Sequence, residues 1–180
     1  MSGKSDEKWA IEMTKIYVDA DACPVKAEVE KTATRHKISV FIVSNGGIRP
    51  SQNPIVTTVV VDHGANVADQ WIANHCGTGD IVVTSDIPLA ARAIERGSLV
   101  VKHNGEILTS KNIGSVLATR DLMSDIRSAD PFFQGRSKAF SKSDRSRFLD
   151  ALERNGLTED TLVIFSSDNG PARGAPGTPL

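Results

Sequence analysis

The sequence has few cysteines, few aromatic residues and no long hydrophobic run. Its 180 residues include two cysteines, Cys23 and Cys76, without CxxC spacing, and aromatic residues make up 5%. Two cysteines are too few for a zinc site built from a cysteine cluster. No stretch of about 18 apolar residues occurs, which excludes an ordinary transmembrane helix. We therefore expect a protein of the reducing cytoplasm that does not enter a membrane.

A strong net charge is also missing. The formal net charge is -1, and hydrophobic and charged residues make up 39% and 24% of the chain. A nucleic-acid partner would need a local basic patch, because no overall positive field attracts it. The length suffices for one domain with a sizeable core. Residues 1–14 are polar, lack the apolar centre of a signal peptide and predict a flexible extension.

Apolar segments alternate with amphipathic ones between residues 15 and 154. The apolar segments, which are rich in β-branched residues, predict strands at 15–18, 38–43, 57–61, 79–85 and 98–101. Apolar residues at helical spacing predict helices at 25–37, 67–76, 88–97, 112–129 and 142–154. A hairpin turn is expected at 103–106. The alternation predicts an α/β fold with a mainly parallel, doubly wound sheet.

Several aspartates follow the predicted strands. Asp19 and Asp21 leave the first strand two residues apart, so extended backbone directs both carboxylates to one side. Asp86 follows the fourth strand, and Asp69 lies one turn into the helix after the third. Ligands of open α/β sheets bind beyond the carboxyl ends of the strands. Because clustered carboxylates repel one another, the pattern predicts a site for Mg²⁺ or Mn²⁺, which prefer oxygen ligands.

Simpler structural interpretations exist for the individual residues. Asp86 is well placed to cap the helix that follows it, and Asp21 to cap the helix beginning near Pro24. Asp69 alone is typical of a solvated helix surface. Cys23 lies near a helix N-terminus, which favours a thiolate, yet no histidine is close in sequence and a small buried thiol is the simpler interpretation.

The motifs themselves resemble a known family. They lie in unbroken order over about residues 15–154: DADACP (19–24), GANVADQWI (64–72), GDIVVTSDIPLAARAIERG (79–97), NGE (104–106), ATRDLMSDIR (118–127) and SKSDRSRFLDALER (141–154). These segments resemble the bacterial YaiI/YqxD family, which is grouped with PIN-like domains. The resemblance implies a three-layer fold, a parallel sheet between layers of helices.

The wider PIN-like class includes metal-dependent ribonucleases with acidic residues at the strand ends. The resemblance thus implies that Asp19, Asp21, Asp69 and Asp86 hold Mg²⁺ or Mn²⁺. Asp19, Asp21 and Asp86 would act in phosphodiester hydrolysis of RNA or single-stranded nucleic acid. The oligomeric state is left open by the sequence.

Four further residues are candidate substrate contacts. Asn45 and Arg49 lie in the loop at 44–54, which is dense in Gly, Pro and Asn. Ser85 follows the fourth predicted strand, and Arg120 lies in the long helix at 112–129. Each of the four can contact a phosphate, although turn chemistry alone accounts for much of the loop composition.

The C-terminal segment 155–180 departs from the family. Its TLVIFSSDNGP (161–171) resembles a sulfatase segment in which an Asp-Asn pair, here Asp168 and Asn169, helps to hold calcium. A sulfatase also needs a Cys or Ser in a C/S-x-P-x-R motif, whereas Cys23 is followed directly by Pro24. We therefore interpret the tail as a sulfatase-like fragment without sulfatase activity.

Two other functions are compatible with the same residues. A haloacid-dehalogenase-like phosphotransferase would use Asp19 as nucleophile and Asp21 as acid/base, with Thr84 and Ser85 ending a later strand. Against it, Cys23 stands where Thr or Val is usual. A module that binds RNA or a nucleotide without chemistry is the third hypothesis.

Overall fold

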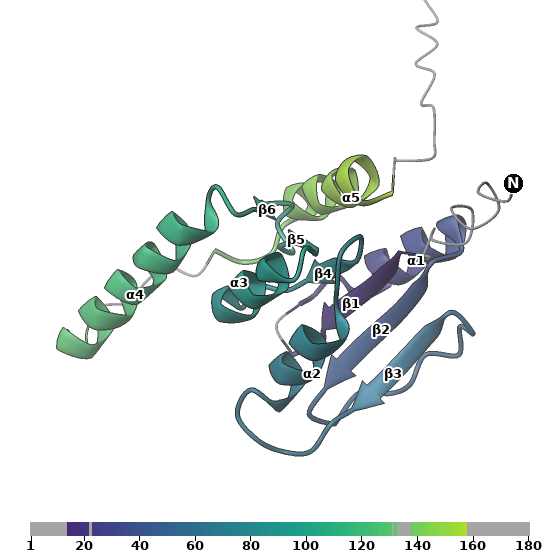
Figure 1. Ribbon diagram of the computed structural model, residues 1–180, viewed down its shortest axis with the longest axis horizontal. Coiled ribbons are helices and arrows are strands. Elements are labelled where there is room, and N and C mark those ends of the chain that lie inside the picture. The colour runs from purple at the N-terminus through teal and green to yellow at the C-terminus, as the bar shows by residue number, and fades with distance from the viewer. Residues whose placement is uncertain (1–13, 22, 131, 133–137, 158–180) are drawn as a thin grey trace, which may run out of the picture.

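A six-stranded sheet runs through the part of the chain that this computed structural model describes, namely residues 14–21, 23–130, 132 and 138–157 (Figure 1). The strands are β1 (Lys15–Asp19), β2 (Ser39–Ser44), β3 (Val56–Val60), β4 (Ile81–Val83), β5 (Leu99–Val101) and β6 (Ile107–Leu108). Their order is β3-β2-β1-β4-β5-β6. Only the β5–β6 pair of this sheet is antiparallel, so the mainly parallel α/β fold is confirmed.

Helices cover both faces of the sheet and complete a three-layer arrangement. They are α1 (Lys26–His36), α2 (Val67–His75), α3 (Ile87–Glu95), α4 (Ile113–Ala129) and α5 (Lys142–Gly156). Helices α1 and α5 pack together on one face, and α2 and α3 pack together on the other. The right-handed crossover preference of parallel strands favours such alternation of helices between the two faces.

The alternation of side chains along β1 shows why helices must cover both faces of the sheet. Ile16 and Val18 enter the core beneath α1 and α5, while Tyr17 enters the core beneath α2 and α3. Successive strand residues point to opposite faces, so a strand with apolar residues at every position must be buried on both. The fully buried Phe148 of α5 completes the first core, and Ile72 of α2 the second.

The strand order places a topological switch point between β1 and β4. From β1 the chain builds outward through β2 to β3, then returns to pair β4 with the other side of β1. Loops leave these two neighbouring strands toward opposite faces, which opens a crevice at their carboxyl ends. Residues that follow β1 and β4 therefore meet at this crevice.

Helix α4 differs from the others because none of its 17 residues is buried. It contacts α3 and then extends away from the rest of the fold (Figure 1). Its predicted position, 112–129, is confirmed, as is the hairpin turn at 103–106, since β5 and β6 flank it. The predicted strand at 79–85 is too long, because Thr78 and Gly79 form a turn and β4 covers only Ile81–Val83.

The predicted flexible extension and the sulfatase-like tail fall almost wholly on residues 1–13 and 158–180, which lie outside the described residues. Helix α5 continues to Gly156, two residues beyond its predicted end at 154. None of the described helices is both long enough and apolar enough to cross a membrane.

Candidate functional site

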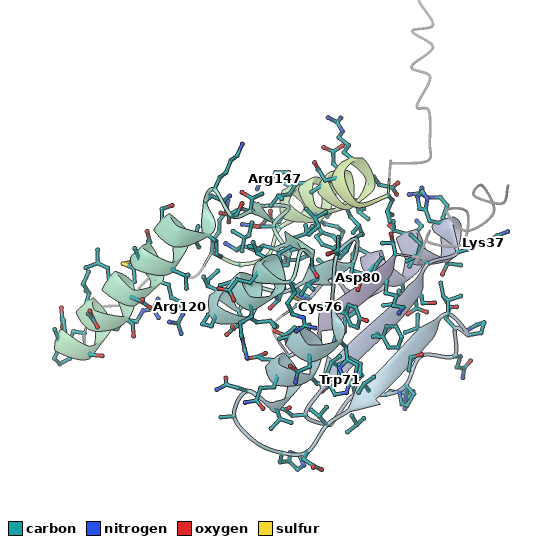
Figure 2. All side chains as sticks on the ribbon, in the orientation of Figure 1. Lys37, Trp71, Cys76, Asp80, Arg120 and Arg147 are labelled. Carbon is teal, nitrogen blue, oxygen red and sulfur yellow. The ribbon has the colours of Figure 1, made fainter. Side chains whose placement is uncertain are left out.

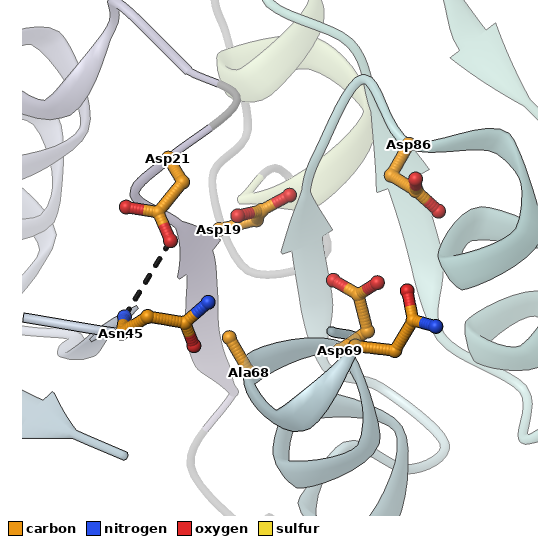
Figure 3. Close-up of a pocket in the computed structure, with 7 residues that line it drawn as sticks. Asp19, Asp21, Asn45, Ala68, Asp69 and Asp86 are labelled. Atoms are coloured by element: carbon orange, nitrogen blue, oxygen red, sulfur yellow. Dashed lines mark hydrogen bonds between the residues drawn. The ribbon is translucent and has the colours of Figure 1, made fainter. Parts of the chain in front are cut away.

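A pocket of about 240 Å³ lies at the switch point and collects all four predicted aspartates (Figure 3). Its polar lining comes from the carboxyl ends of β1 and β2 and from the N-terminal ends of α2 and α3: Asp19, Asp21, Asn45, Asn66, Asp69 and Asp86. We call it the acidic pocket. The positive ends of two helices adjoin it, which partly offsets the charge of the carboxylates.

Asp19 is the last residue of β1 and is only 4% exposed. Its Oδ2 accepts a hydrogen bond of 3.0 Å from the Thr84 hydroxyl just beyond β4. Burial raises the pKa of Asp19, the bond from Thr84 opposes that rise, and the charges of Asp21 and Asp86 add to it. The fold therefore disfavours the ionised form of this carboxyl group when no cation is present.

Asp21 lies in the exposed turn after β1 and is tied to the end of β2. Its Oδ1 accepts a bond of 3.2 Å from the Ser44 hydroxyl, and its Oδ2 accepts a long bond of 3.5 Å from the Asn45 backbone N–H (Figure 3). The interpretation of Asp21 as a helix cap is wrong, because α1 has Val25 at its N-cap and no side-chain cap. Asp21 instead joins two strand ends.

Asp86 does cap a helix. It is the N-cap residue of α3, and its Oδ1 accepts a bond of 2.8 Å from the Leu89 backbone N–H. Its own backbone N–H donates to the Thr84 hydroxyl at 3.0 Å. The capping interpretation is thus confirmed, and the same residue also lines the acidic pocket. Thr84 links Asp86 to Asp19 through its single hydroxyl group.

Asp69 lies in the first turn of α2 and is half-buried. Burial raises its pKa, and the charges of Asp86 and Asp19 raise it further, while Arg92 opposes the rise. Two carboxyl groups of the pocket therefore resist ionisation for the same reason. The part of these shifts that comes from repulsion between the carboxylates is relieved when a cation binds.

Besides the carboxylates, the acidic pocket contains the side-chain amide of Asn45. Asn45 Oδ1 is buried and has no hydrogen-bond partner among the described residues, while its Nδ2 donates to the Gly64 carbonyl at 3.5 Å. Asn45 also lines the acidic pocket. A buried carbonyl-type oxygen without a donor is unfavourable, and a cation or a water bound to one would satisfy it.

The four carboxyl groups do not form a ready-made ligand cage. Within the described residues, no three His, Cys, Asp or Glu side chains are gathered closely enough to hold one ion directly. Zinc requires such a direct set, whereas Mg²⁺ commonly keeps several waters and uses one or two carboxylates. The donor chemistry of the pocket thus suits a hydrated hard cation, and the predicted ligand set of Asp19, Asp21, Asp69 and Asp86 stays a prediction.

The candidate substrate contacts separate in space. Asn45 lines the acidic pocket, whereas Ser85 and Arg120 line a second pocket beside α4. Arg49 is exposed in the loop between β2 and β3 and lines neither pocket. The thiol of Cys23 is buried, and burial raises its pKa to about 12, so the interpretation as a buried thiol is confirmed.

Comparison with known proteins identifies the family. The sequence profile of a family described as "Uncharacterized BCR, YaiI/YqxD family" matches residues 17–156. The chain belongs to the YaiI/YqxD family. A UPF0178 protein of Roseobacter denitrificans is 69% identical over 150 residues, which cover 83% of this chain and 99% of the relative. A UPF0178 protein of Parvibaculum lavamentivorans is 55% identical over 141 residues, 78% of this chain and 92% of the relative. No solved structure is significantly similar to the chain.

The family match encloses the whole acidic pocket, because every residue that lines it lies between 17 and 156. The segment from residue 157 onward lies outside the match. YaiI/YqxD membership is thus confirmed for the part of the chain that builds the candidate site.

Two polar residues of the site were not predicted as members of it. Asn66 precedes α2 with a left-handed φ of 64° and lines the pocket. Ser44 ends β2 and holds Asp21. The Gly-Ala-Asn sequence before α2 is a recognisable turn signal for the first, since asparagine tolerates this backbone conformation better than most residues. The role of Ser44 depends on strand pairing, which the sequence does not show.

Proposed function

We propose that the acidic pocket is the centre of a divalent-metal-dependent nuclease that acts on RNA or single-stranded nucleic acid. The observation that supports this most is the convergence of four aspartates at the switch point, two of which have raised pKa values. An unpaired Asn45 oxygen at the same pocket adds to it. Nucleic acid as substrate is implied by the PIN-like resemblance and not by the pocket alone.

The residues of the pocket fit Mg²⁺ or Mn²⁺ by the chemistry of their donors. Asp19, Asp21, Asp69 and Asp86 would hold the ion directly or through water, with Asn45 Oδ1 as a neutral ligand. The ion would supply charge neutralisation at the phosphate and a lowered pKa for a bound water.

The chain itself holds the carboxylates in place. The Thr84 hydroxyl orients Asp19, and the Ser44 hydroxyl orients Asp21, so two neighbouring strand ends fix their separation. The N-terminal ends of α2 and α3 present positive partial charge to the pocket, which favours an anionic phosphate group. Such fixed placement removes reorganisation from the reaction.

The decisive experiment measures cleavage of 5′-labelled single-stranded RNA and DNA in Mn²⁺, Mg²⁺ or EDTA. Asp19→Asn keeps the shape of the side chain and removes its charge, and we expect it to slow cleavage by about 100-fold or more. Asp80→Asn is the matched control, because Asp80 adjoins the opposite end of the sheet (Figure 2). The control should retain metal-dependent cleavage.

Cleavage that survives Asp19→Asn, or that persists in EDTA, would overturn the proposal. If the folded wild-type chain retains RNA in the presence of metal but does not cut it, the non-catalytic binding module replaces the nuclease. If instead phosphoesters are hydrolysed and an acyl-phosphate is trapped on Asp19, the haloacid-dehalogenase-like phosphotransferase replaces it. Each result selects one of the three hypotheses.

A further inference from the structure

A second pocket of about 410 Å³ adjoins the acidic pocket across the turn between β4 and α3. Its polar lining comes from that turn, from the β5–β6 hairpin and from α4: Ser85, Lys102, Glu106, Ser115, Thr119 and Arg120. We call it the basic pocket, because its two cations outnumber its single carboxylate. The four aspartates give the acidic pocket the opposite sign.

Among the described residues, the two cations of the basic pocket form ion pairs only with acidic residues close to them in the sequence. Lys102 Nζ lies 2.6 Å from Glu106 Oε2, and Arg120 Nη1 lies 3.0 Å from Asp121 Oδ1 on the exposed side of α4. The side chains of Arg120 and Asp121 are 50% and 65% exposed. Exposed pairs of this kind contribute little stability. Arg120 is therefore able to turn toward a bound anion, whereas Lys102, whose side chain is only 20% exposed, already lies at the pocket.

Hydroxyl groups complete a lining that suits a phosphate. Ser115 and Thr119 lie one turn apart on α4 beside Arg120, where their hydroxyls donate to the backbone carbonyls of Asn112 and Ser115. Both bonds are exposed and within the helix, so either hydroxyl can turn to donate to a phosphate instead. Ser85 is hydrogen-bonded to His103 Nδ1, which fixes the position of its hydroxyl group at the edge of the pocket. Serine, threonine and arginine side chains are frequent donors to nucleic-acid phosphates.

The two pockets meet at consecutive residues. Ser85 lines the basic pocket and Asp86 lines the acidic pocket, so the β4–α3 turn forms their common wall. When an ion occupies the acidic pocket, a ligand that bridges both pockets carries one anionic group next to another. Successive phosphates of a nucleic-acid strand have this arrangement, whereas a free phosphate or a mononucleotide monophosphate fills only one pocket.

We propose that the basic pocket binds a backbone phosphate of a single nucleic-acid strand whose neighbouring phosphodiester lies at the acidic pocket. This assignment rests on the proposed function and extends it, because it gives the strand a path from the switch point across Ser85 toward Arg120. Figure 2 shows Arg120 on α4. It also gives the otherwise exposed α4 a role in binding.

The test measures binding of a fluorescein-labelled single-stranded RNA 12-mer by fluorescence anisotropy, with Mg²⁺ present. All proteins are full-length and carry Asp19→Asn, which slows cleavage enough for the RNA to survive the measurement. Any loss of bound metal is then the same in every protein compared. Arg120→Gln and Lys102→Gln should each raise the Kd about fivefold and lower the slope of log K against log salt concentration by about 0.7. Arg127→Gln, a control on the same helix outside the pocket lining, should leave both nearly unchanged.

A third variant predicts an effect of opposite sign. Glu106→Gln removes the only carboxylate of the pocket lining and frees Lys102, so it should lower the Kd about twofold. Loss of the binding surface would raise the Kd and not lower it, and thermal unfolding of each variant checks folding independently. Equal Kd values for the Arg120→Gln and Arg127→Gln variants would overturn the assignment.

The outcomes also separate this assignment from the proposed function. If the wild-type chain cleaves RNA but Arg120→Gln binds like Arg127→Gln, the nuclease stands and the phosphate subsite falls. If nothing is cleaved while Arg120→Gln and Lys102→Gln lose affinity, the nuclease falls and the subsite stands. If the Asp19→Asn chain binds no RNA and the wild-type chain cleaves none, both fall.

Discussion

The two ends of the sheet carry aspartates in opposite circumstances. At the amino ends of β1 and β4, Asp80 bonds two backbone groups: its Oδ1 accepts from Lys15 N–H and its Oδ2 from Gly77 N–H, both at 3.0 Å. At the carboxyl end of β1, Asp19 is buried beside other carboxylates, and its pKa is raised. Asp80 joins a strand to a turn, whereas Asp19 lies where burial and neighbouring carboxylates disfavour its ionised form.

The comparison shows that an aspartate beside a strand is not by itself a functional signal. Asp80 satisfies backbone donors, so its charge serves the fold. Asp19 shares a pocket with Asp21, Asp69 and Asp86, which gives a concentration of charge that the fold does not need. Perturbed carboxyl groups that gather in a crevice are typical of functional sites.

The comparison predicts that the fold depends on Asp80 more than on Asp19. Asp80→Ala removes an acceptor from two backbone N–H groups and should lower the free energy of unfolding by about 2 kcal/mol. Asp19→Asn removes a disfavoured charge and should leave the metal-free free energy of unfolding unchanged or raised. Urea unfolding in EDTA measures both. Greater destabilisation by Asp19→Asn would contradict the comparison.

Added metal should make stability depend on Asp19 and not on Asp80. An ion that binds only the folded chain stabilises it by about 1.4 kcal/mol at ten times its Kd, which is about 4 °C for a domain of this size. We expect this rise in Tm with Mn²⁺ for the wild-type chain and for Asp80→Asn, and a much smaller one for Asp19→Asn. Thermal unfolding monitored by circular dichroism gives the values. Equal shifts in all three proteins would place the ion elsewhere.

The fold was largely predictable from the sequence because the sheet is buried on both faces. Segments such as IYV before Asp19 and IVV after Asp80 are apolar at every position, which few structures other than a parallel strand require. The two-residue strand β6 was not predicted, because it is too short for a periodic pattern. The strand order was also beyond the sequence, since it depends on which strands pair.

Helix α4 shows a different limit of prediction. Val116, Met123 and Ile126 recur at nearly helical spacing, and such a stripe ordinarily indicates a face packed on the core. In the structure no residue of α4 is fully buried: Val116 packs against the core while partly exposed, and Met123 and Ile126 are half-buried. Periodicity therefore predicted the helix but not its partner.

The sequence predicted those residues of the candidate site that lie directly at the ends of strands. Asp19 and Asp86 follow neighbouring strands, so the switch-point rule brings them together. The hydroxyl of Thr84, which bonds both Asp19 and the Asp86 backbone, was not predicted, because this contact depends on the register of β1 against β4. The separation of Ser85 and Arg120 into a second pocket equally depends on where α4 lies.

The smallest expected effect is the dependence of stability on pH that His103 causes at the carboxyl end of the sheet. His103 lies at the carboxyl-end side next to Ser85, and its pKa is lowered from 6.5 by burial and by the charge of Lys102, while Asp144 opposes the shift. Folding thus disfavours the protonated ring. The contribution of His103 to stability is complete above pH 6.5 and is lost as the pH falls from there through the folded-state pKa.

Two measurements test this pH dependence. Titration of the His103 ring signals by NMR should give a midpoint below 6.5, and a midpoint at or above 6.5 would contradict the prediction. The loss of unfolding free energy between about pH 8 and pH 5.5 should be smaller in His103→Gln than in the wild-type chain. His63→Gln, which replaces an exposed histidine in the loop before α2, is the matched control and should behave like the wild-type chain.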